Sequence, residues 1–355
     1  MRKPRIALWG SHANRTPPAY AVYRPLFSRH FDYVDRIDEA DFVVAGFIHD
    51  IREGSAELAH LLRRRPQASV VVLSEEPLWD SVWSGTGWTA STVRIGSAEG
   101  AFTVHQLNHC TSSIYRYSRI PYFVTTRNDF AIRYASLLAR NARLGAEGIR
   151  ARWRRAPIAE AYFAERREGE QFEVCEPRFD LRGLCTFRTQ LAESAESAAT
   201  LRQGAGWEGN TVRRQNLPDW HLDKLAQLDC RARIVSALEN THHPDYVTEK
   251  LFDAYAVLGL PLYYAAPGHS VFRLVAPESF INLHGLSPQE ARGMIASFET
   301  SGPCLDAYRS TLSSLASLFK DTDALLDERR RVVQECVAEL RRIGMAAGSP
   351  AASAA

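Results

Sequence analysis

The chain has 355 residues, of which 45% are hydrophobic and 24% are charged, and its formal net charge is +2. This length allows two domains with separate cores, and the composition is typical of a soluble globular protein. The nearly balanced charge argues against a strong general attraction to nucleic acid, so no nucleic-acid partner is expected.

The N-terminal residues and the cysteines give information about the cellular location of the protein. Six cysteines are scattered without a CxxC pair or a Cys/His cluster, which favours free thiols in a reducing compartment. The start, Met1-Arg-Lys-Pro-Arg, leads directly into a strand-like segment, so no signal peptide is expected. No apolar run approaches the roughly 18 residues that span a bilayer. We therefore expect a cytoplasmic protein.

The first half of the chain alternates between predicted strands and helices. Strands are expected at 6–9, 41–46 and 69–73, and a helix at 55–65. The continuous apolar run at 69–73 favours parallel pairing, and the alternation favours a doubly wound sheet. The segment 79–89 is rich in Trp, Ser and Gly and is expected to be a long loop. A helix rich in Arg, Ala and Leu is expected at 130–156.

The second half again combines strands and helices. A domain boundary is expected near Pro157, after the basic run RARWRR. The expected division is a first domain at 1–155, a second at 156–320, a charged amphipathic helix at 321–345 and a disordered tail at 346–355. Between 156 and 320, strands are expected at 234–238, 260–265 and 280–283, and helices at 188–200, 222–228, 288–298 and 312–319.

The stretch 233–266 is the most informative part of the sequence. It reads as a strand, a polar turn, a helix with Asp245 as its N-cap and Gly259 as its end, and a second buried strand. Such a unit aims the helix N-terminus at the carboxyl edge of the sheet, where phosphates bind in open α/β folds. Lys250 adds a positive charge there, while Glu239 and Glu249 can accept hydrogen bonds from hydroxyls. These groups suit a phosphate that carries a sugar.

The segment ENTHHPDYVTEKLFDAY, followed by a Pro-containing strand, resembles the signature of the α-1,3/4-fucosyltransferases, glycosyltransferase family 10. The resemblance covers about a tenth of the chain strongly, and a weaker one lies at 115–123. It implies the GT-B fold: two facing Rossmann-like domains with a cleft between them, the first binding the acceptor and the second the GDP-sugar. The terminal helix is then expected to pack back across the domains.

The resemblance also implies an activity. Members of this family transfer fucose from GDP-fucose, with inversion, to a hydroxyl of a glycan in α-1,3 or α-1,4 linkage. The expected acceptor is an N-acetyllactosamine-like or lipopolysaccharide-type oligosaccharide; GDP-fucose is a substrate, and no cofactor is required. Animal members carry a membrane anchor and a lumenal stem that this chain does not show, which fits a bacterial cytoplasmic enzyme, at most peripheral to the inner membrane. The alternatives are another GDP-sugar donor, or a catalytically silent protein that binds a glycan or nucleotide.

Inverting transfer requires a base on the acceptor side and positive charge on the diphosphate side. The segment LSEEPLW starts at the carboxyl end of the predicted strand 69–73, and the family's base lies in a Glu-x-Pro-like or Gly-Glu-Asn-like context at this place. The resemblance therefore implies Glu75 as the base, with Glu76 second. The alternative is that both are solvated loop carboxylates or cap the following helix.

The same resemblance assigns the donor contacts. Lys250 and Tyr246 match the family's contacts with the diphosphate and the fucose, and Glu249 matches the contact with the ribose. Glu239 and Asn240 are expected to hold the sugar or to shape the loop.

Two further groups complete the predicted donor site. Thr248 is expected either to bind the donor or only to cap the helix. The family also has a phosphate-binding arginine after residue 175. Neither Arg182 nor Arg188 fits the family's spacing cleanly, and Arg188 is preferred.

Acceptor oligosaccharides bind through hydroxyl hydrogen bonds and aromatic faces. The candidate acceptor residues, each of which is also explained as a loop or core residue, are His12, Asn14, Trp83, Asn108 and His109.

No metal site is predicted. The DxD sequence Asp321-Thr-Asp323 elsewhere holds a metal and a nucleotide diphosphate, but here it opens a charged helix, where acidic residues favour the dipole. The adjacent His242 and His243 lie in a turn and are weak evidence for a metal. An activating divalent metal stays an open alternative. The arginines of 321–343 offer contact with an anionic membrane, although interleaved Asp and Glu favour a solvated face.

Overall fold

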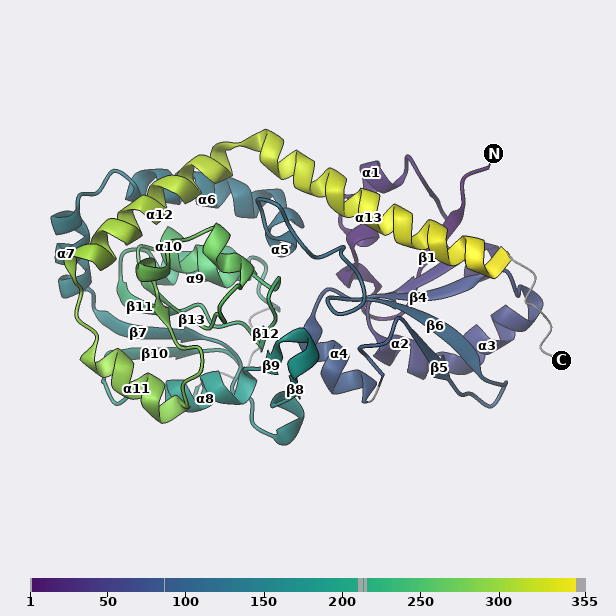
Figure 1. Cartoon of the computed structure of the whole chain (residues 1–355), viewed down its shortest axis with the longest axis horizontal. Helices are drawn as coiled ribbons and strands as arrows, with labels where there is room; N and C mark the ends of the chain where they lie inside the picture. Colours follow the sequence, from purple (N-terminus) through teal and green to yellow (C-terminus); the bar gives the residue numbers. More distant parts are fainter. Residues whose placement is uncertain (1, 86, 210–212, 214–215, 349–355) are drawn as a thin grey trace. The chain divides into compact units, whose positions relative to one another are not determined.

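The computed structural model describes residues 2–85, 87–209, 213 and 216–348. The chain divides into two compact units, coloured along the sequence in Figure 1. Unit 1 comprises Met1–Ser118 and Leu326–Ala355, and unit 2 comprises Arg119–Leu325.

Unit 1 contains a six-stranded sheet in the order β2-β1-β3-β4-β6-β5. Its neighbours pair in parallel except β5, which is antiparallel to β6. The strands are β1 (Arg5–Leu8), β2 (Asp32–Tyr33), β3 (Phe42–Ala45), β4 (Ser69–Leu73), β5 (Thr92–Ile95) and β6 (Phe102–Leu107). The apolar run of β4 is buried throughout, as expected for a parallel strand covered on both faces.

The helices of unit 1 include α1 (Arg24–Phe27), α2 (Ile48–Glu53), α3 (Ser55–Arg64) and α4 (Pro77–Ser84). Helices α2 and α3 bury Ile48, Ile51, Leu58 and Leu61 in the core of the unit. Helix α4 covers 79–84 of the loop expected at 79–89. Pro77 stands in its first turn, where the missing N–H costs nothing, and Leu78 and Ser81 are buried, so tertiary packing holds this Trp- and Ser-rich segment in a helix.

Helix α13 (Thr322–Gly348) belongs to unit 1 from Leu326 onward. Its carboxylates hold the segment that follows β6: Ser113 Oγ donates to Glu335 Oε2 (2.8 Å), and the Ser118 backbone N–H donates to Glu328 Oε1 (2.7 Å). Residues 346–348, expected in a disordered tail, continue this helix, and 349–355 lie outside the described residues.

Unit 2 contains a five-stranded, fully parallel sheet in the order β10-β7-β11-β13-β14 and a small antiparallel sheet, β12-β9-β8. The larger sheet consists of β7 (Ile158–Phe163), β10 (Thr200–Gln203), β11 (Ala232–Ser236), β13 (Leu260–Tyr263) and β14 (Ile281–Asn282). The smaller one consists of β8 (Cys175–Glu176), β9 (Leu181–Gly183) and β12 (Thr241–His242).

Helices cover both faces of the larger sheet. Figure 1 shows α6, α10 and α12 on one face, where they pack together, and α8 and α11 on the other. The helices are α5 (Tyr122–Thr125), α6 (Asn128–Asn141), α7 (Ala146–Arg155), α8 (Cys185–Glu193), α9 (Trp220–Leu228), α10 (Glu249–Ala256), α11 (Pro288–Ser297) and α12 (Gly302–Lys320). The predicted α/β class, with two Rossmann-like and mainly parallel sheets, is confirmed.

The units divide at Ser118, whereas the sequence placed the boundary near residue 155. The difference comes from α6, which buries Phe130, Tyr134 and Leu138 in unit 2. The Asn141 amide also donates to the carbonyls of Tyr255 and Ala256 (3.0 and 2.8 Å) at the end of α10. The single helix expected at 130–156 is two helices, α6 and α7. How the two sheets face each other stays a prediction.

Two further features concern the whole described chain. None of the six cysteines, all of which are described, forms a disulfide. Among the described residues, no helix combines the length and the apolar character needed to cross a bilayer.

Candidate functional site

The predicted motif leads from the end of β11 through a buried turn into α10. Helix α10 begins at Glu249 with Thr248 as its N-cap residue, so the N-cap predicted at Asp245 is wrong. The reason is a bond from across the turn: Glu239 Oε1 accepts the backbone N–H of Thr248 (2.7 Å) and also its hydroxyl (2.9 Å). This contact holds Thr248 in an extended conformation and delays the start of the helix by three residues.

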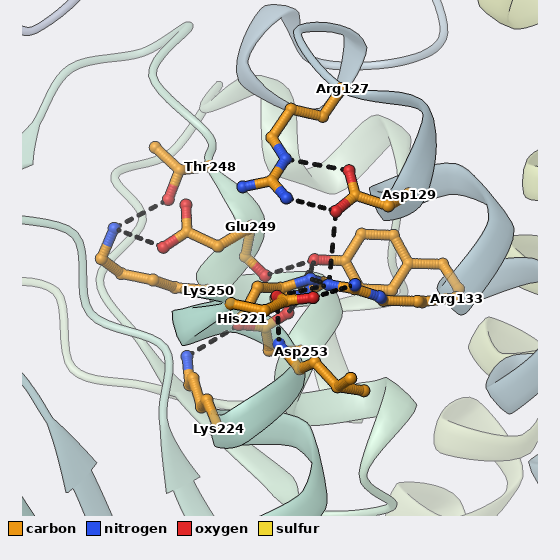
Figure 2. Close-up of polar contacts among 12 residues, drawn as sticks. Arg127, Asp129, Arg133, His221, Lys224, Thr248, Glu249, Lys250 and Asp253 are labelled. Carbon is orange, nitrogen blue, oxygen red and sulfur yellow. Dashed lines mark hydrogen bonds and ion pairs between the residues drawn. The ribbon is translucent and has the colours of Figure 1, made fainter. Parts of the chain in front are cut away.

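Lys250 lies within a buried group of acceptors. Its Nζ donates to Thr248 Oγ1 (2.9 Å) and pairs with Glu239 Oε2 (3.1 Å) and Glu249 Oε1 (3.3 Å); Figure 2 shows the contacts with Thr248 and Glu249. Burial lowers the pKa of Lys250, but the two carboxylates outweigh burial and leave this pKa above its ordinary value. Burial also raises the pKa of Glu239, against the opposing effect of Lys250. The ammonium group therefore stays charged.

Three predicted donor residues carry buried polar atoms without a hydrogen-bond partner among the described residues. These atoms are Glu249 Oε2, Asn240 Oδ1 and Arg188 Nε. Arg188 NH1 donates to the carbonyl of Leu238 (3.3 Å), the residue before Glu239, and the charge of Arg188 lowers the pKa of Lys250. Because an unsatisfied buried polar atom is costly, each of these three atoms is a candidate to bond a polar ligand.

Arg182 lies at a different part of the motif. It stands on β9 opposite His242 of β12, and its NH1 donates to the hydroxyl of Tyr264 (3.1 Å), which follows β13. Tyr246 is buried and lies in the turn before α10, where its backbone N–H donates to the His243 carbonyl (2.9 Å). The structure thus places Arg188 against the end of the strand that leads into the turn, and Arg182 opposite His242 within it.

A second polar network, which the sequence analysis did not predict, links α10 to α6 and α9 through the side chain of Asp253 (Figure 2). The Asp253 carboxylate accepts from Tyr134 Oη (2.6 Å), His221 Nε2 (2.8 Å) and Lys224 Nζ (2.8 Å). Arg133 donates to His221 Nδ1 (2.9 Å), so a neutral imidazole keeps its proton on Nε2, facing Asp253.

The charges in this network favour an ionised carboxylate. Burial raises the pKa of Asp253, but Lys224 and His221 together outweigh burial and hold it below its ordinary value. Tyr134 Oη also lies 3.2 Å from the Glu249 carbonyl, which ties the first turn of α10 to α6. Tyr134, His221 and Lys224 come from α6 and α9, and no local pattern in the sequence pairs them with Asp253.

In unit 1, Glu75 is the second residue after β4, beyond the carboxyl end of the strand as predicted. Its side chain is fully buried, and Oε1 accepts from Arg15 Nε (2.8 Å) and Tyr20 Oη (2.7 Å). Arg15 also bridges to Glu76. Burial raises the pKa of Glu75, while Arg15 and Tyr20 pull it down. Neither Arg15 nor Tyr20 was predicted, although Arg15 lies in the polar loop after β1.

Two of the predicted acceptor residues, His12 and Trp83, lie together with ring centroids 5.4 Å apart. His12 Nδ1 is 2.8 Å from Oδ1 of the buried Asp50, and Trp83 stacks on Trp79 at 4.4 Å. Asn14 is exposed in the 3-10 turn Ala13–Arg15.

The remaining two candidates, Asn108 and His109, follow β6. Asn108 is buried and holds its own loop, with Nδ2 donating to the Trp88 carbonyl (2.9 Å) and Oδ1 accepting from the Cys110 backbone N–H (2.9 Å). His109 stacks on Tyr115 with ring centroids 4.5 Å apart. Asn108 thus has a structural role in this loop, and its contact with an acceptor stays a prediction.

Within the part of the chain that the structure describes, no group of three or more His, Cys, Asp or Glu side chains is arranged to hold a metal ion. In the DxD sequence, Asp321 Oδ1 accepts the Ala324 backbone N–H (3.0 Å) and Oδ2 pairs with Arg119 (2.8 Å). These contacts are those of a residue at a helix start.

The motif has counterparts among known proteins. Residues 209–299 match the family described as glycosyltransferase family 10 (fucosyltransferase), C-terminal part. The family predicted from the motif is confirmed for this segment. A comparison with curated proteins gives no significant match.

Solved structures give weaker likenesses to the chain. An alpha1,3-fucosyltransferase structure with GDP-fucose is 16% identical, with a TM-score of 0.44 over 91% of this chain and 90% of that one. A structure with GDP is 14% identical, with a TM-score of 0.44 over 97% and 91%.

Proposed function

We propose that the protein transfers fucose from GDP-fucose to a glycan hydroxyl with inversion, forming an α-1,3 or α-1,4 linkage. The observation that carries this proposal is the set of unsatisfied buried atoms in and beside the family 10 segment: Glu249 Oε2, Asn240 Oδ1 and Arg188 Nε. Two acceptors and one cationic donor are the groups that a sugar nucleotide, with its hydroxyls and its diphosphate, would satisfy.

The donor diphosphate is proposed to lie at the N-terminus of α10. Lys250 and Arg188 supply two positive charges there, and the first-turn N–H groups and the helix dipole add to them. Glu249 Oε2 accepts from a ribose hydroxyl, and Asn240, Glu239 and Tyr246 border the fucose. When the glycosidic bond breaks, the negative charge that develops on GDP is stabilised by these fixed cations.

The base is proposed to be Glu75, with Glu76 as its alternative. A buried carboxylate with a raised pKa suits proton abstraction near neutral pH. Arg15 and Tyr20 both donate hydrogen bonds to the Glu75 carboxylate. An acceptor hydroxyl that gives its proton to Glu75 therefore has to displace one of these two donors. The acceptor is proposed to be an N-acetyllactosamine-like or lipopolysaccharide-type glycan that contacts His12 and Trp83.

Calorimetric titration with GDP, GDP-fucose, GDP-mannose and UDP tests the donor site. We expect GDP and GDP-fucose to bind and UDP not to bind. Lys250→Met should weaken GDP binding by about 10- to 100-fold, the value of one charge-assisted contact. Arg330→Gln, on the exposed face of α13, is the control and should bind GDP like the wild type. The donor assignment fails if GDP does not bind or if Lys250→Met leaves its affinity unchanged.

Fucosyl transfer to a panel of glycans then tests the reaction. Transfer from GDP-fucose but not from GDP-mannose supports the proposed donor, and the reverse result identifies another GDP-sugar as the substrate. Binding of GDP-fucose without any transfer or hydrolysis would leave only a binding protein.

A further inference from the structure

Helix α7 carries the basic run RARWRR on a firmly fixed scaffold. It buries Ile149 and Trp153, whose Nε1 donates to the Leu258 carbonyl (2.7 Å) and whose ring meets Tyr308 edge-on at 5.0 Å. These contacts fix the rotation of the helix about its axis. Its arginines therefore lie on the outer side, and Arg152, Arg154 and Arg155 are exposed.

Most of the arginines in this region have no carboxylate partner. Five exposed arginines form no ion pair with any described residue: Arg143, Arg152, Arg154, Arg155 and Arg231. Arg231 is beside the end of α7, because its carbonyl accepts the Ile158 backbone N–H (3.0 Å). Acidic residues in this region include Glu147, which pairs with Arg150, and Asp229, which pairs with Arg140. Glu299 is exposed, and Asp306, on the helix α12 that packs against α7, pairs with Arg309. The local charge is therefore strongly positive, although the whole chain has a net charge of only +2.

A small cavity lies within this surface. It has a volume of about 220 Å³ and is lined by Arg150, Trp153, Arg154, Arg233 and Thr300. Three of the five lining residues are arginines, and none is acidic. Guanidinium groups bind phosphate oxygens in pairs, so the cavity suits one phosphate group.

We propose that this α7 arginine surface, formed by Arg143, Arg150, Arg152, Arg154, Arg155, Arg231 and Arg233, binds the phosphates of anionic lipid headgroups at a membrane surface. A ten-residue helix is about 15 Å long, and five unpaired arginines exceed what one phosphate can contact, so an array of phosphates matches them better than a single soluble anion. The choice of a membrane over nucleic acid rests on the proposed function, since a lipopolysaccharide-type acceptor is carried by lipid.

The arginines of α13 do not offer an equal surface. Arg330 pairs with Asp327 (2.7 Å) and Arg342 with Glu339 (2.7 Å), each three residues away on the same helix. Their charges are largely neutralised, as interleaved acidic residues predict. We therefore prefer α7 to the helix at 321–343 as the part of the chain that contacts a membrane.

Co-sedimentation with vesicles tests the proposal without donor or acceptor, so its failure is separate from failure of the transferase reaction. The probes are phosphatidylcholine vesicles with and without phosphatidylglycerol. We expect binding to the anionic vesicles only, weakened by added salt because the charges are exposed. A triple variant, Arg152→Gln, Arg154→Gln and Arg155→Gln, should bind about 100-fold more weakly, since each arginine near an anionic surface contributes about fivefold.

A charge-matched control removes three arginines that already have partners: Arg36→Gln, Arg330→Gln and Arg342→Gln. It should bind vesicles like the wild type. Both triple variants should keep their far-ultraviolet circular dichroism and their affinity for GDP, which confirms that they fold. The proposal is overturned if the wild type ignores anionic vesicles or if both triple variants weaken equally. If dilute inorganic phosphate prevents binding to vesicles, the surface is instead a site for a soluble phosphate. If the protein binds duplex DNA more tightly than vesicles, the surface is instead a nucleic-acid-binding surface.

Discussion

Replacing Asp253 by asparagine tests the network that supports α10. The carboxylate is fully buried and accepts from Lys224 Nζ and His221 Nε2, each at 2.8 Å. The Asp253→Asn substitution keeps the shape of the side chain but removes its charge, which leaves the Lys224 ammonium buried without a counter-ion. Breaking a buried ion pair in this way costs about 3–5 kcal/mol, a large part of the ~5–15 kcal/mol that stabilises a typical domain.

Asp229→Asn is the matched control. Asp229 also forms a two-bond pair, with Arg140 at 2.5 and 2.7 Å, but both side chains are about one-third or more exposed. Water can solvate Arg140 after the substitution, so we expect a loss below about 1 kcal/mol. Comparing the two variants therefore shows whether the loss of stability depends on the burial of the ion pair or only on its removal.

The effect of Asp253→Asn on stability should depend on pH, in a direction that the pKa of Asp253 determines. The folded-state pKa of Asp253 is held below its ordinary value, so its stabilising effect is complete above the pKa of the unfolded carboxylate, about 3.9, and is lost as the pH falls further. Urea titrations followed by circular dichroism should show the full difference between wild type and Asp253→Asn at pH 7 and a smaller one near pH 3. A difference that stays constant, or one no larger than that of Asp229→Asn, would refute the reasoning.

Three further predictions concern the candidate site. Lys250→Met leaves the buried Glu239 carboxylate without its cation. The loss of folding stability in this variant should be largest near pH 8 and smaller at lower pH, where Glu239 becomes protonated. Urea titrations at several pH values measure this loss, and an equal loss at all of them would contradict the prediction. Glu75→Gln should reduce fucosyl transfer by about 100-fold or more while GDP affinity stays unchanged, and retained transfer would assign the proton to another group. Asp50→Asn, which weakens the hold on His12 Nδ1, should raise the acceptor KM about tenfold with kcat unchanged; a fall in kcat alone would argue against acceptor binding by His12.

The grouping of the candidate donor residues around Lys250 could be predicted from the sequence because these residues are close together in the chain. Glu239, Glu249 and Lys250 come from one strand-turn-helix unit, and such a unit brings them to one edge of the sheet whatever surrounds it. The start of α10 was misplaced because its cause is a side-chain bond across the turn, from Glu239 to Thr248, that no local signal shows.

Other features depend on contacts between distant segments and were missed. The partners of Asp253 come from α6 and α9, more than one hundred and about thirty residues away in the chain. Helix α4 was predicted as a loop because its Trp and Ser residues have weak helical preference, and burial of Leu78 decides its conformation. The same holds for charge. The sequence shows basic runs at both α7 and α13, and only the positions of their carboxylates distinguish paired arginines from unpaired ones.

The environment of Glu75 shows why a sequence-predicted base needs its structural partners to be understood. Burial alone raises the pKa of this carboxyl group and would favour the protonated form, which accepts no proton. Arg15, 2.8 Å away, opposes burial and favours the carboxylate. The two effects together allow a carboxylate that is charged yet more basic than one in water, which is what proton abstraction from a sugar hydroxyl requires. Loss of Arg15 should therefore impair transfer through protonation of Glu75, so activity of an Arg15→Gln variant should recover as the pH is raised.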